Sequence, residues 1–151
     1  MFCSKILMEL LPNIHLLGMF IVTFTVVFRW KALIPIYIYV FLDGLRAGFS
    51  PWWIPYLYIW TILWGVAMLL PRKMPKKVAA VVYPVVCGLH GFLFGLLYLP
   101  AYVIINKLEG AEILIWYLSG IPFDLLHTVG NIAAGIIVLP LSELLRKLMK
   151  R

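Results

Sequence analysis

The sequence predicts an all-α integral membrane protein that forms one domain over residues 1–151. Hydrophobic residues make up 64% of the chain and charged residues only 13%, whereas a soluble domain is near half apolar and a quarter charged. Apolar runs recur along the chain and lie between short basic clusters. The net charge of +7 therefore indicates membrane topology, and we expect the lipid bilayer and not nucleic acid as a partner.

The N-terminal segment 1–11 is too short to cross a membrane. At about 1.5 Å per residue a helix of this length spans roughly 17 Å, half of a hydrocarbon core. No small-residue cleavage site follows it, so it does not read as a signal peptide. We expect the outer half of a first helix that is truncated in this chain. Lys5 and Glu9 are i, i+4 partners that neutralise each other or face a pocket.

Two short apolar runs follow, 14–28 and 32–42, separated by Arg29 and Lys31. They form either two short helices or one long bent element. Because burying Arg and Lys in the middle of a membrane helix is costly, we favour two helices that turn at this basic pair. Residues 46–51 are predicted to form a loop, since Gly48 and Ser50-Pro51 are turn signals.

The remaining runs are long enough to span a bilayer. Run 54–70 ends before a basic segment, and run 78–105 is the longest. A polar loop, 106–112, precedes a short amphipathic piece at 113–118. Pro122 suits a first helical position, so the last helix is expected to begin near residue 120 and to end near Leu145.

Charge sets the expected orientation. Ten of the 13 Lys and Arg residues lie in three clusters, at 29–31, 72–77 and 146–151. By the positive-inside rule these clusters mark cytoplasmic ends. The C-terminus is then cytoplasmic, while Asp43, Arg46 and the loop 106–112 lie outside.

The last predicted helix carries Asp124, His127 and Asn131 on one face, at i, i+3 and i+7. A start at Pro122 places them in the outer half of the membrane, where ionisable groups usually mark a ligand or ion path. Alternatively, Asp124 caps its helix while His127 and Asn131 form interhelical hydrogen bonds.

Aromatic residues crowd the third run. Tyr56, Trp60 and Trp64 repeat every four residues and could form a wall that stacks on a flat ligand. Lipid contact or core packing explains them equally well, and an interfacial belt explains Trp52 and Trp53. Further pocket candidates near the outer side are Asn13, Tyr98 and Tyr102, and His15 begins the first run there. His90, between two glycines, is expected to be a hydrogen-bonded packing residue.

Enzyme and metal signatures are absent. The sequence has no H-E-x-x-H, no G-x-S-x-G and no P-loop. The three histidines are far apart in sequence, which argues against a metal site, and the two cysteines read as reduced packing residues. We expect no enzyme activity, no cofactor and no bound metal.

Several stretches together resemble a family. These are L-P-N-I-H-L-L at 11–17, the run 32–44, the aromatic segment 48–64, the segment 88–100, and above all G-I-P-F-D-L-L-H-T-V-G-N at 120–131. They resemble the substrate-binding S components of bacterial energy-coupling factor (ECF) type vitamin transporters, over nearly the whole chain.

The resemblance implies a six-helix membrane fold with a pocket at the outer face. Matching positions are the loop 46–53, with Arg46 and Trp53, and the residues Tyr56, Trp60, Tyr98, Asp124, His127 and Asn131. It also implies a vitamin-like substrate, a membrane coupling subunit and two cytoplasmic ATPases as partners. The small-residue A-x-x-x-A pattern with which the family contacts its coupling subunit does not occur in residues 1–11.

Two other classes remain open. A secondary transporter or channel subunit driven by an ion gradient would also explain Asp124 and His127 within the membrane. A membrane enzyme could use the same two residues as acid and base, although the missing motifs disfavour it.

Overall fold

A computed structural model describes residues 1–8 and 15–150 of the chain. The described part consists of helices joined by short loops and contains no strand. Its helices, including the 3-10 helices η1 and η2, are α1 (Phe2–Leu7), α2 (Leu17–Phe28), η1 (Arg29–Ala32), α3 (Leu33–Ala47), η2 (Pro51–Trp53), α4 (Tyr56–Leu69), α5 (Lys76–Phe92), α6 (Phe94–Asn106), α7 (Ala111–Gly135) and α8 (Val138–Leu148).

Within the described residues, four helical stretches are long and apolar enough to cross a membrane: Leu17–Ala47, Pro51–Leu69, Lys76–Asn106 and Ala111–Gly135. Many of their large apolar side chains are exposed on the surface of the bundle, as lipid-facing residues are. The prediction of an all-α protein with several membrane-length helices is confirmed.

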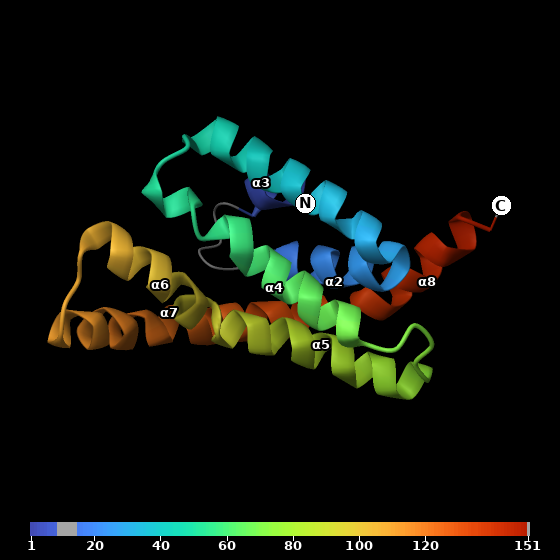
Figure 1. The fold of residues 1–151 in the computed structure, drawn as a ribbon. Helices are drawn as coiled ribbons and strands as arrows, with labels where there is room; N and C mark the ends of the chain where they lie inside the picture. The colour runs from blue at the N-terminus through green and yellow to red at the C-terminus, as the bar shows by residue number, and fades with distance from the viewer. Residues whose placement is uncertain (9–14, 151) are drawn as a thin grey trace.

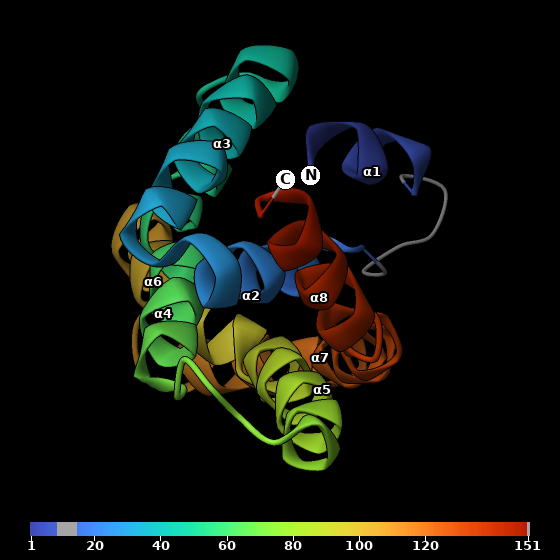
Figure 2. The ribbon, with the colours of Figure 1, turned by 90° about the vertical axis from the view of Figure 1, so that its right-hand side faces the viewer.

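Helix α2 lies at the centre of the bundle. Eight of its 12 residues are buried, and it contacts α4, α5, α7 and α8. Figure 2 shows α2 surrounded by α3 and α4 on one side, by α5 below and by α7 and α8 on the other side. A helix that is apolar all round is stable only in such a position or in lipid.

The chain changes direction between α2 and α3, as the two-helix interpretation predicted (Figure 1). Arg29 adopts a positive φ of 55° and ends the helical path of α2. Its guanidinium donates hydrogen bonds to the carbonyls of Met68 and Leu70 at the end of α4. A cation satisfies free carbonyls at a helix C-terminus, so this basic residue ties two helix ends together.

Helices α5 and α7 pack closely along a glycine seam. A Cβ atom at Gly91 would lie 2.8 Å from the His127 carbonyl oxygen, and one at Gly135 would lie 2.6 Å from Pro84 Cα. A Cβ atom at Gly88 would meet the Ile132 side chain at 2.5 Å. Glycine allows helix backbones to approach this closely.

The predicted boundaries of the last two elements are wrong. Helix α7 begins at Ala111 and continues without a break through Pro122, so 113–118 is not a separate piece. The longest run is divided at Leu93 into α5 and α6, and the last is divided into α7 and α8. When α5–α6 and α7–α8 are each counted as one bent segment, the described helices form the six segments expected.

The basic clusters gather at one end of the bundle, on the right in Figure 1. There Lys76 Nζ lies 2.7 Å from Glu143 Oε1, and Arg146 donates a 3.0 Å hydrogen bond to the Val26 carbonyl. The loops 48–50 and 107–110 lie at the opposite end. Asp43 was expected in an outer loop, but it is fully buried within α3.

Candidate functional site

Aromatic and imidazole rings from the segment before α2 and from the helices α3 to α6 surround Trp60, which is 1% exposed. Its ring centroid lies 5.9 Å from that of His15, 5.6 Å from His90 and 5.8 Å from Phe94. His127 joins through His15 at 5.0 Å and through Phe94 at 4.7 Å. The ring cluster is completed by two tyrosines, Tyr39 and Tyr56, at 6.4 and 5.7 Å from Trp60. Two of the three histidines, far apart in sequence, thus lie against one indole, and the third lies against its neighbours His15 and Phe94.

Several polar atoms of the ring cluster lack partners. Five buried side-chain atoms of the described residues have no hydrogen-bond partner, and four of them belong to the ring cluster: His15 Nδ1, His127 Nδ1, Tyr39 Oη and Trp60 Nε1. Leaving a buried polar group unpaired costs about 1–3 kcal/mol. Buried polar groups are normally hydrogen-bonded, so these four atoms are candidates for hydrogen bonds to a polar ligand.

Asp124 caps a different helix from its own. Its Oδ1 accepts a 2.9 Å hydrogen bond from the Gly95 N–H, in the first turn of α6. A carboxylate satisfies free N–H groups at a helix N-terminus and interacts favourably with the helix dipole. Asp124 therefore holds α6 to α7, and the alternative that it caps its own helix is wrong, because α7 begins at Ala111.

Asn131 and His127 share the buried face of α7 with Asp124, as predicted. The Asn131 side chain lies between α2 and α5, where Cβ atoms at Gly18 and Gly91 would approach it to 3.2 and 2.8 Å. Because α7 begins at Ala111, His127 lies about 24 Å from the start of the helix, measured along its axis at 1.5 Å per residue. The three residues are therefore deeper in the bundle than a start at Pro122 implied.

Tyr98 lines two of the pockets in the described part of the chain. One, of about 230 Å³, opens between α6 and α7 and reaches Asp124 and His127. The other, of about 290 Å³, lies under the loop before α4 and includes Trp52 and Tyr102. The Tyr98 hydroxyl donates a 2.9 Å hydrogen bond to the Trp52 carbonyl, so this side chain forms a wall shared by both pockets.

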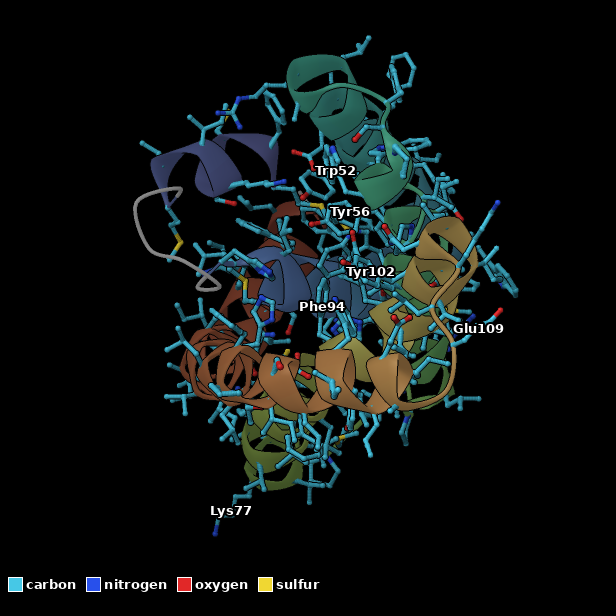
Figure 3. All side chains as sticks on the ribbon, turned by 90° about the vertical axis from the view of Figure 1, so that its left-hand side faces the viewer. Trp52, Tyr56, Lys77, Phe94, Tyr102 and Glu109 are labelled. Atoms are coloured by element: carbon cyan, nitrogen blue, oxygen red, sulfur yellow. The ribbon has the colours of Figure 1, made fainter. Side chains whose placement is uncertain are left out.

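The predicted aromatic wall is only partly assembled in this cluster. Figure 3 shows Tyr56 and Phe94 pointing toward the interior, whereas Lys77 projects away from the bundle. Trp64 instead lies beside Trp30, with its Nε1 3.3 Å from the Arg29 carbonyl. Trp53 donates a 2.8 Å hydrogen bond to the Val40 carbonyl and is directed toward α3.

The remaining predicted positions lie elsewhere. Arg46 is exposed in the last turn of α3, and the site role predicted for it stays a prediction. Asn13 falls outside the described residues. His90 Nε2 lies 3.2 Å from the Ile59 carbonyl, the hydrogen-bonded packing position expected for it.

Sequence reasoning missed the ion pair at the far side of the ring cluster. Asp43 accepts hydrogen bonds of 2.7 and 2.6 Å from Lys5 Nζ, across 38 positions of sequence. The available signal was the i, i+4 spacing of Tyr39 and Asp43, which places both on one helical face.

Within residues 1–8 and 15–150, no group of three or more His, Cys, Asp or Glu side chains is arranged to hold a metal ion.

Comparison of the chain with protein-family models, with curated proteins and with solved structures gave no match.

Proposed function

We propose that this chain is the substrate-binding subunit of an ECF-type importer in a bacterial cell membrane. It takes up a vitamin or related micronutrient at the outer face. A membrane coupling subunit and two cytoplasmic ATPases then drive release inward, and the basic end of the bundle, with the C-terminus, faces the cytoplasm.

The observation that carries the proposal is the set of unpaired polar atoms around Trp60. His15 Nδ1, His127 Nδ1 and the Tyr39 hydroxyl offer hydrogen bonds, while the indole and Phe94 offer flat apolar surface. Small-molecule sites combine a largely apolar lining with a few placed polar groups. The chain has a candidate binding site but no nucleotide-binding motif, which fits a subunit that borrows its ATPase.

Uptake by reconstituted protein tests this proposal. The chain is purified alone, and the small molecule that accompanies it is extracted and identified by mass spectrometry. That molecule is then offered to vesicles that contain the chain with an ECF coupling module. We expect accumulation that requires internal ATP. Accumulation by the chain alone, driven by a proton or sodium gradient, would instead establish the secondary transporter.

A matched pair of variants links uptake to the ring cluster. Trp60→Phe should weaken binding of the identified molecule at least ten-fold, whereas Trp64→Phe, one turn along the same helix at the basic end, should leave it unchanged. Equal affinity in both variants would place the binding site away from Trp60.

A further inference from the structure

The Lys5 ammonium occupies a cage of aromatic rings. Its Nζ lies 6.0 Å from the centroid of Tyr39, 5.9 Å from Trp52 and 5.6 Å from Tyr56. Cations are attracted to aromatic faces at about this distance, and cages of this kind recognise organic ammonium groups. Figure 3 shows Trp52 and Tyr56 in the space between α1 and the helices α3 and α4.

The base of the cage is a carboxylate that requires a cation. The Asp43 side chain is fully buried, and both of its oxygens lie within 2.7 Å of Lys5 Nζ. Removing one partner of a buried ion pair is strongly destabilising, because it leaves an uncompensated charge. Asp43 therefore selects for a positively charged occupant.

The present occupant is accessible from outside the cage. The Lys5 side chain remains 26% exposed, and it belongs to a six-residue helix without a buried residue. The cage is also continuous with the ring cluster, since Tyr39 and Tyr56 both contact Trp60. A ligand bound beside Trp60 can thus place one end in the cage.

We propose that Asp43, Tyr39, Trp52 and Tyr56 form a binding site for an organic ammonium group, and that Lys5 is an internal occupant which the substrate displaces. The inference rests on the proposed function and deepens it, because it assigns the substrate to the class of organic cations. One cation replaces another, so the buried carboxylate stays compensated while α1 is released.

Chemical rescue tests the cage without knowledge of the natural substrate. Lys5→Ala is purified and melted with n-butylammonium chloride, which copies the end of the lysine side chain, with choline chloride, and with sodium chloride at equal ionic strength. We expect the variant to melt below the wild type and the organic cations to restore its melting temperature in a saturable way. Sodium chloride should not do so.

The ion pair at the opposite end of the bundle provides the matched control. Lys76→Ala breaks the exposed pair with Glu143, and its melting should not respond to n-butylammonium. Lys5→Ala should bind n-butylammonium at least about ten-fold more tightly than the wild type, because a tethered competitor reduces apparent affinity. No rescue, or equal rescue of both variants, would overturn the cage.

The wild type supplies a second measurement if Lys5→Ala does not fold. Its tryptophan fluorescence should respond to n-butylammonium, because Trp52 lines the cage. The response should disappear in the double variant Lys5→Met with Asp43→Asn, which removes both charges together. A wild type that does not respond at any concentration contradicts the proposal.

These outcomes are separable from the fate of the transporter proposal. If the molecule that accompanies the purified chain is neutral or anionic and binds Asp43→Asn normally, the cage is refuted and the importer still stands. If n-butylammonium rescues Lys5→Ala but no ATP-dependent uptake occurs, the cage stands and the importer fails.

Discussion

Replacing Gly91 by alanine tests how tightly α5 and α7 are packed. The new Cβ atom would lie 2.8 Å from the His127 carbonyl oxygen and 2.8 Å from Asn131 Nδ2. The backbone atom cannot move aside like a flexible side chain, so the helices must separate by several tenths of an ångström. Forcing an extra carbon into a packed interior costs about 1–3 kcal/mol.

Gly120→Ala provides the control, because a Cβ atom there meets nothing within 4 Å. Both substitutions gain helix propensity of about 1 kcal/mol, and this gain cancels in their difference. Gly91→Ala should therefore be less stable than Gly120→Ala by about 1–3 kcal/mol, or roughly 2–12 °C in melting temperature.

The assay is a thermal melt of both variants in one detergent, followed by ligand titration of the folded protein. Displacement of His127 should also weaken ligand binding in Gly91→Ala. Equal melting temperatures, or a more stable Gly91→Ala, would show that the two backbones are not in contact, and the argument for a seam would fail.

Three further predictions concern helix ends and topology. Arg29→Met should lower the free energy of unfolding by about 1.5–3 kcal/mol, because hydrogen bonds from a charged group to the end of α4 are lost; a chemical denaturation series measures this. Asp124→Ala should cost about 1 kcal/mol through loss of the cap on Gly95, whereas Asp124→Asn keeps an acceptor oxygen and should melt near the wild type. In a chain whose native exposed cysteine is replaced, a cysteine at Lys76 should react with an impermeant reagent only from the cytoplasmic side and one at Glu109 only from outside; the reverse pattern would invert the proposed orientation.

The existence of the helices could be read from composition, but their breaks could not. Hydropathy alone predicts the apolar runs, because lipid requires them. Pro122 reads as a helix start, yet α7 passes through it, since neighbouring helices in a membrane bundle can satisfy the carbonyl that a proline leaves free. The break at Leu93 has no local signal. It lies two residues before Gly95, whose N–H donates a hydrogen bond to Asp124 on another helix. A contact between residues this far apart in sequence cannot be read from local sequence.

The candidate site was predictable where it follows helical periodicity. Asp124, His127 and Asn131 share a face because of their spacing, and all three are buried. The pairing of His15 with His127 and of Lys5 with Asp43 depends on how distant helices pack. Nothing in local sequence encodes those distances, so the sequence predicted one side of the site and missed the other.

The glycine seam has a mechanical consequence for the molecule. Helices α5 and α7 are in backbone contact and form a rigid pair. Helix α1, in contrast, is held against α3 through the ion pair of Lys5 with Asp43. Displacement of Lys5 by a ligand would therefore move α1 and leave α5 and α7 in place. A binding protein that bridges α1 to α7 should lock the molecule, while one confined to α5 and α7 should leave it free to work.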